Sequence, residues 1–353
     1  MSIIFAILMF SVLIFVHELG HFMTAKLFGV QVNEFSMFMG PAIFKKQVGE
    51  TLYAIRLIPF GGYCAMEGED EDTDNPRSFQ KAAWWKRTII LVAGSAMNLL
   101  TGIVIYCFLF LPQQTVVEPA IQEFTDCCIF NTEAGLREGD IIRELDGEKI
   151  YVSSDVTFFL GFSEDGTHDI TVERDGEIIE FRDFEMGHTH ENEDGTTYRH
   201  YGFSIGRPVE VGLGGKLGYV WNRVADDIRM VRYSLQMLFT GRAGLGDMSG
   251  PVGIVSQMGQ IAEASGTAWI AFLNLLSVCA FIAINLAVMN LLPIPALDGG
   301  RVVCLLLTTA IERITRRKID PKYEGYIHGA GMILLLGLMA VIMFKDIFVI
   351  VKG

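Results

Sequence analysis

The chain has 353 residues, of which 51% are hydrophobic and 20% charged, and its mean hydropathy is +0.37. This composition is too apolar for an ordinary soluble protein and too charged for membrane spans alone, so several spans plus an extramembrane domain are predicted. The net charge of −13 is concentrated in residues 113–206, which hold 22 Asp and Glu against 6 Lys and Arg. This acidity argues against nucleic acid as a partner.

Six cysteines occur without the C-x-x-C spacing of a metal site. Cys107, Cys279 and Cys304 lie in or beside apolar runs, so we expect packing residues rather than a disulfide framework. The adjacent pair at 127 and 128 has no firm explanation. The N-terminus lacks the basic segment and the cleavage site of a signal peptide, and we expect it to remain as a span.

The first predicted span covers residues 2–28, since no charged residue precedes position 17. Its second half contains His17, Glu18 and His21 in an H-E-x-x-H pattern. Residues four apart share a helix face, so the two imidazoles can bind one metal ion while the glutamate takes a proton from water. The alternative is that these side chains only pair with one another. A catalytic zinc would need a third protein ligand from elsewhere.

Short strands are predicted within residues 29–86, and a turn is predicted at Pro59–Tyr63. A hairpin here could present a free sheet edge beside the first span, and such an edge can accept an extended peptide. A plain loop with incidental β character is an equal alternative. The predicted strands are Glu34–Phe38, Phe44–Val48 and Thr51–Leu57.

Thr88–Leu111 is uncharged and long enough to cross a bilayer, which makes it the second predicted span. Its small residues at Ala93–Ala96 would let helices approach closely. Asn98 is a polar group within this span. Its side chain could bond a neighbouring backbone group or could point at the metal site, and the pattern leaves both open.

The acidic block at 113–206 has the turn residues and short β-like runs of a compact β-rich domain. His188, His190 and His200 lie near an acidic loop, where a solvated loop is favoured over a second metal site. Residues 217–239 have helical apolar spacing and form a predicted amphipathic helix, either in the membrane interface or packed on the soluble domain.

The third uncharged run extends from Ala264 to Leu297 and is broken by Pro293 and Pro295. Prolines free backbone carbonyls, which is tolerated where protein or water surrounds them. Asp298 follows directly and is the candidate third ligand, with a helix-capping or interfacial aspartate as the alternative. The fourth predicted span covers 329–344 and continues toward Val351.

Lys and Arg cluster in residues 29–86 and 299–328, so both segments are predicted to be cytoplasmic. The acidic domain and both termini are then extracytoplasmic. His17 lies ~22 Å along the first span at 1.5 Å per residue. Asp298 follows the third span, which runs in the same direction. Both are therefore predicted in the cytoplasmic half of the bilayer.

Two motifs resemble those of the site-2 protease family, which are intramembrane zinc metalloproteases. One is His17-Glu18-Leu19-Gly20-His21, and the other is N-x-x-P-x-P-x-L-D-G from Asn290 to Gly299. The likeness covers nearly the whole chain and is closest to the bacterial branch, similar to the regulator of sigma-E protease, that cleaves anti-sigma factors and signal-peptide remnants. Leu136–Ile150 resembles one PDZ domain, and Gly250–Ile254 resembles a further family signature.

The resemblance implies that His17, His21 and Asp298 bind Zn²⁺ and that Glu18 activates water. It also implies that certain residues engage the substrate, either near the metal or in a membrane-facing loop and edge strand beside the cleft. Two positions depart from the family pattern, Phe38 in a segment that often reads G-F-G and Ser95 where proline is common. The implied substrate-binding residues are Asn285, Asn290, Phe35, Ser36, Met37, Phe38, Met39 and Gly40.

The fold expected is a polytopic α-helical membrane protein with four transmembrane helices, a membrane-associated β-hairpin region and an inserted extracytoplasmic PDZ-like domain. The expected function is hydrolysis of single-span membrane proteins, such as anti-sigma factors, in a bacterial plasma membrane. Its alternatives are a non-catalytic PDZ scaffold and a metal transporter. The expected divisions are protease core at 1–112, PDZ-like domain at 113–206, amphipathic helix and linker at 207–263, and protease core at 264–353.

Overall fold

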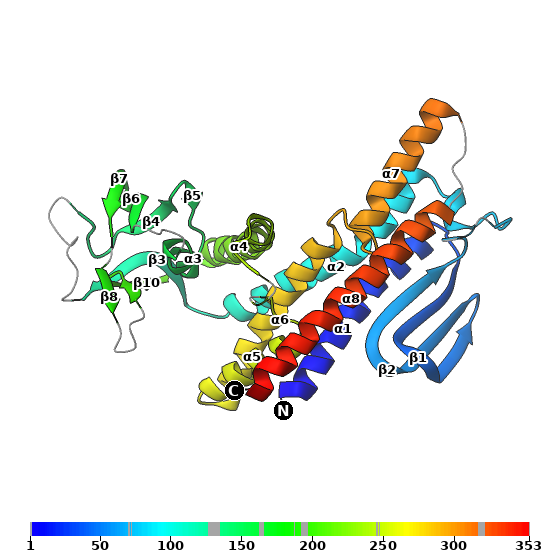
Figure 1. The fold of residues 1–353 in the computed structure, drawn as a ribbon, viewed down its shortest axis with the longest axis horizontal. Coiled ribbons are helices and arrows are strands. Elements are labelled where there is room, and N and C mark those ends of the chain that lie inside the picture. The colour runs from blue at the N-terminus through cyan, green and yellow to red at the C-terminus, as the bar shows by residue number, and fades with distance from the viewer. Residues whose placement is uncertain are drawn as a thin grey trace. The chain divides into compact units, whose positions relative to one another are not determined.

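The computed structural model divides the chain into two compact units. The first, here the membrane unit, comprises Met1–Tyr106 and Met230–Gly353, and the second, here the inserted unit, comprises Cys107–Arg229. Figure 1 shows their elements. The structure describes residues 2–69, 71, 73–125, 135–161, 166–186, 188–191, 197–244, 246, 248–316 and 322–352. The pair at Cys127 and Cys128 lies outside these residues.

Among the described residues, four helices are long and apolar enough to cross a membrane. The first two end one residue before the predicted ends, the third lies inside the predicted uncharged run, and the fourth extends beyond its predicted range in both directions. This agrees with the predicted polytopic protein. The helices are α1 (Ser2–Leu27), α2 (Trp84–Phe110), α6 (Ala268–Asn290) and α8 (Lys322–Lys352).

Two further helices complete the membrane unit. Helix α5 (Pro251–Ala264) lies in a region predicted as loop and linker, and it begins at a proline, which suits the first helical position. Helix α7 (Asp298–Thr315) begins at the candidate third ligand. One apolar cluster joins the start of α1 to α5 and α6 through Leu13, Met258 and Cys279.

The region after α1 folds as two long antiparallel strands, β1 (Val32–Val48) and β2 (Thr51–Met66), seen as the paired blue arrows in Figure 1. The first part of β1 pairs on both sides, with Leu52–Ile55 and with Gly62–Met66. The predicted hairpin is therefore present. The chain also reverses direction at Pro59–Tyr63, as predicted: residues 52–55 run parallel to residues 34–37, whereas residues 62–66 run antiparallel to them, although β2 continues through the reversal.

The inserted unit contains a sheet in the order β10-β3-β4-β6-β7 with antiparallel neighbours, and β5 pairs with β4. Its apolar core includes Leu136, Ile142 and Val156. The predicted amphipathic helix is α4, which begins in this unit. The elements are β3 (Thr115–Phe124), β4 (Ile141–Leu145), β5 (Glu148–Lys149), α3 (Ser153–Leu160), β6 (Thr167–Arg174), β7 (Glu177–Glu185), β8 (His188–Glu191), β9 (Thr197–His200), β10 (Phe203–Glu210) and α4 (Leu213–Thr240).

Candidate metal centre

The two histidines of the first motif converge because they lie one helical turn apart on α1. The Nε2 atoms of His17 and His21 are 3.3 Å apart. The Nδ1 atom of His21 lies 2.8 Å from the backbone carbonyl of Ile90, a group that can only accept. Nδ1 of His21 therefore carries the proton, and its Nε2 presents a lone pair toward His17.

Asp298, far away in sequence, completes this cluster. Its Oδ2 atom lies 3.2 Å from Nε2 of His17 and 3.4 Å from Nε2 of His21. Among the described residues, these three form the group whose ligand atoms lie close enough together to bind one metal ion. Their meeting agrees with the predicted third ligand.

The distances within this cluster suit zinc. Tetrahedral zinc with ligands at ~2.0–2.2 Å has ligand atoms separated by about 3.3–3.6 Å, and these three pairs lie at 3.2–3.4 Å. Oδ2 of Asp298 is buried and receives no well-aligned hydrogen bond within the described part of the chain. The lone pairs of the two imidazoles and the negative carboxylate all point to one place and would repel one another without a cation there. This set of donor atoms therefore fits a zinc ion.

Glu18 lies beside this cluster, and its carboxylate accepts a hydrogen bond from the backbone of Cys64 on β2. Glu18, both histidines and Asp298 line one cavity of about 700 Å³. Its walls include the last part of β2, Arg301 of α7 and Met332 of α8. Burial and the nearby Glu18 raise the pKa of the Cys64 thiol, which disfavours the thiolate form that binds metal.

Helix α2 supplies the support behind both histidines. Gly94 leaves no space for a side chain, since a Cβ atom there would lie 2.4 Å from Nε2 of His21. One turn earlier Ile90 accepts from His21, and one turn later the Asn98 amide lies 3.3 Å from Nδ1 of His17. Of the two possibilities for Asn98, the structure favours the site, because this buried amide faces a candidate ligand.

The predicted substrate-binding residues are dispersed. Met39 lines the cavity, whereas Phe35 packs in an aromatic cluster with Phe15 and Phe22 and Ser36 accepts a hydrogen bond from Arg56 at 3.0 Å. Arg56 also donates to the carbonyl of Gly40, and Phe38 has a positive φ of 71°.

The last part of β2 provides the sheet edge at the cavity. Gly62–Met66 lines the cavity and pairs with β1 on one side. Within the described residues no strand pairs with its other side. The expected edge at Phe35–Met37 is therefore an inner segment, because the chain turns back at 59–63.

The described lining of the cavity does not include Asn285 or Asn290, two of the residues expected to contact the substrate.

Two supports of the site were not predicted from the sequence. The carbonyl of Ile90 and the amide of Cys64 support the site through backbone groups, for which no side-chain pattern exists. Hydrophobic periodicity gave no signal for them, whereas the H-E-x-x-H spacing and the broken third span did signal the ligands.

Two histidines and a carboxylate around one point, with a glutamate beside them on a membrane helix, define a class of membrane-embedded metal-dependent hydrolase. Comparison with known proteins agrees. The model of peptidase family M50 matches residues 5–338, and the chain belongs to this family, the site-2 proteases. The predicted family and enzyme class are thereby confirmed, and the zinc metalloproteases among the relatives below confirm the predicted metal.

Full-length relatives support this assignment. A Clostridium perfringens protein named as a proposed zinc metalloprotease is 33% identical over 98% of each chain. The regulator of sigma-W protease RasP of Bacillus subtilis is 28% identical, again over 98% of each chain. The zinc metalloprotease RasP of Oceanobacillus iheyensis shows the same identity and coverage.

Proposed function

We propose that this protein hydrolyses membrane-spanning proteins within the bilayer, with His17, His21 and Asp298 holding zinc and Glu18 acting as general base. One observation carries this proposal. The three candidate ligand atoms lie within 3.4 Å of one another, and Glu18 lines the same cavity. A structural ion would not require this open cavity or an adjacent carboxylate.

The residues divide the reaction between them. When bound, zinc supplies a Lewis acid that polarises the scissile carbonyl and lowers the pKa of water toward ~7. Glu18 accepts a proton from the attacking water and passes it to the departing nitrogen, so the peptide bond is replaced by a carboxyl group and an amine. The backbone of Cys64 keeps the Glu18 carboxylate oriented during this transfer.

A helical substrate must present an extended peptide to this site. Its carbonyls are hydrogen-bonded within the helix, so the segment must unwind locally, and a sheet edge can satisfy the freed groups. Gly62–Met66 is the edge that borders the cavity, and Met39 contributes to the lining. Roles for Asn285, Asn290 and the remaining residues of Phe35–Gly40 in substrate contact stay predictions.

The inserted unit is suited to select substrates. Its antiparallel sheet with the short helix α3 is compatible with the PDZ-like domain predicted from Leu136–Ile150. We place this unit on the extracytoplasmic side and the metal toward the cytoplasmic side, because basic residues cluster in 29–86 and 299–328. By analogy with the sigma-W regulator named above, anti-sigma factors are suitable substrates in a bacterial plasma membrane.

Replacement of Glu18 by Gln tests this function. We expect Glu18→Gln protein in lipid nanodiscs to keep one zinc per chain and to leave a single-span reporter uncut, while the wild type cuts it. Zinc analysis and product detection give both readings. Cleavage by the variant at the wild-type rate would remove Glu18 as the base. A scaffold would cut no reporter in either form, and a transporter would instead move zinc across sealed vesicles.

A further inference from the structure

The loop that precedes Asp298 is contacted by helix α8 at Pro295 and Ala296. From this contact we infer that His328 on α8 is a positioning residue for Asp298, and hence for the zinc. The inference rests on the proposed function, in which Asp298 is a zinc ligand. His328 does not itself belong to the described lining of the large cavity around the metal centre.

The loop has an unusual backbone at Ala296, two residues before the ligand. Ala296 has a φ of 81°, a conformation that residues with a side chain rarely adopt. Such a conformation persists only where surrounding contacts enforce it. The Ala296 N–H donates to Nδ1 of His328 at 3.0 Å, and this hydrogen bond is the contact that fixes it.

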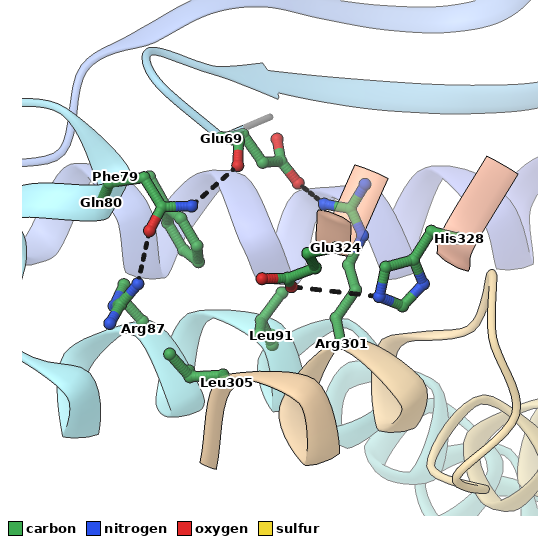
Figure 2. A pocket seen from close by; sticks show the side chains of 9 residues that line it. All are labelled: Glu69, Phe79, Gln80, Arg87, Leu91, Arg301, Leu305, Glu324 and His328. Carbon is green, nitrogen blue, oxygen red and sulfur yellow. Dashed lines mark hydrogen bonds and ion pairs between the residues drawn. The ribbon is translucent and has the colours of Figure 1, made fainter. Parts of the chain in front are cut away.

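The hydrogen bond determines which nitrogen of His328 carries the proton. A backbone N–H can only donate, so Nδ1 must accept and the neutral ring carries its proton on Nε2. Nε2 lies 3.9 Å from Glu324, one turn earlier on α8. Figure 2 shows both side chains extending from α8 toward Arg301 of α7, which pairs with Glu69. His328 is 8% exposed, so water does not readily replace this contact.

A second contact on the same face of α8 is made by Gly331, which lies directly against Pro295 of the loop. A Cβ atom at Gly331 would lie 2.5 Å from Cβ and 2.7 Å from the carbonyl oxygen of Pro295. Gly331 follows His328 by three residues, so both face the loop. Helix α8 therefore supports Pro295 and Ala296 together, and Asp298 begins α7 immediately afterward.

The test measures zinc release to a chelator from full-length protein in nanodiscs, with thermal unfolding as the check on folding. His328→Leu keeps the bulk and removes the acceptor, whereas His328→Asn places an oxygen near the position of Nδ1. We expect release to be about tenfold faster or more in His328→Leu, the lower end for lost support of a ligand. His328→Asn should remain close to wild type.

Two controls separate this role from general packing and from the metal assignment. Asp346→Leu damages α8 elsewhere, where Oδ2 of Asp346 accepts the N–H groups of Gly250 and Gly253 at 2.9 Å each. It should lower the unfolding temperature without changing zinc release. Asp298→Asn should release zinc fastest; if it keeps zinc like the wild type, the proposed function fails, whatever His328 does.

Gly331→Ala displaces the loop with His328 intact and should also speed zinc release, which keeps the test decisive if His328→Leu does not fold. Fast release in folded His328→Leu, with His328→Asn and Asp346→Leu near wild type, supports the inference, and Gly331→Ala takes its place where His328→Leu does not fold. Wild-type release in folded His328→Leu would overturn the inference, as would wild-type release in Gly331→Ala where it is the variant tested. Equal acceleration in Asp346→Leu, or loss of rescue by His328→Asn, would also overturn it.

Discussion

The side-chain amide of Asn98 lies 3.3 Å from Nδ1 of His17, although the two residues belong to different helices and are 81 positions apart. Since Nε2 of His17 faces the other ligand atoms, its lone pair belongs there and Nδ1 must carry the proton. The atom at this distance is the amide nitrogen Nδ2, and a 180° rotation of the amide group brings its oxygen there to accept this proton. This orientation also gives a partner to Oδ1, a buried atom that otherwise has none in the described structure.

Asn98→Ala should therefore weaken zinc binding roughly 10- to 100-fold, the usual cost of losing the partner of a ligating histidine. Asn98→Asp keeps an oxygen acceptor of the same shape and should bind zinc far better than the alanine variant. Zinc affinity measured by chelator competition distinguishes the two. An alanine variant with unchanged affinity would mean that the amide does not orient His17.

Gly94→Ala should disrupt the centre through bulk alone. A Cβ atom at this position would lie 2.4 Å from Nε2 and 2.8 Å from Cε1 of His21, so the imidazole or helix α2 must shift. We expect zinc content to fall well below one per chain while the protein still inserts and remains monodisperse in detergent. Ala93→Gly, on the adjacent position of α2, removes bulk and is the matched control. Full zinc occupancy in Gly94→Ala would contradict the close approach of α2.

The inserted unit should lose stability as the pH rises. Burial and the neighbouring Asp155 raise the pKa of Asp226 from 3.8 to about 7, against the opposing Arg229, whose Nη2 lies 2.6 Å from Asp155 and 2.9 Å from Asp226. The folded state binds this proton more tightly than the unfolded chain. Its stabilisation is therefore full below pH ~4 and is lost as the pH rises through about 7.

Hydrogen exchange of α3 amides in the full-length protein, corrected for intrinsic rates, measures this effect. Protection should fall by roughly tenfold in total between pH 6 and pH 8, most of it below pH 7. Asp226→Asn, which is neutral at both values, should remove the dependence. Equal protection of the wild type at both pH values would show that the pKa of Asp226 is not raised into this range.

The ligands could be predicted from sequence because each has a local signal. His17 and His21 are four apart in an uncharged run, and Asp298 directly follows a span broken by prolines. The reversal within β2 also had a local signal, in Pro59 and the glycines that follow it. Its consequence had none, because the pairing of residues 62–66 with β1 and their place beside the cavity depend on tertiary contacts.

The supporting contacts could not be predicted for a different reason. His328 and Ala296 are 32 positions apart, and their hydrogen bond uses a backbone group that any residue would supply. The support from Ile90 and Cys64 is likewise by main chain. One sequence without related sequences shows which residues can do chemistry, but not which backbone groups approach them.

The most direct measurement of intramembrane hydrolysis is the mass of both products from a single-span reporter cut in nanodiscs. His17 lies ~22 Å from the start of α1 at 1.5 Å per residue, well within a ~30 Å hydrocarbon layer. We therefore predict that the wild type cuts one peptide bond inside the reporter's apolar segment and that Glu18→Gln yields neither product. A cut confined to the polar flanks, or the same products from Glu18→Gln, would contradict the account.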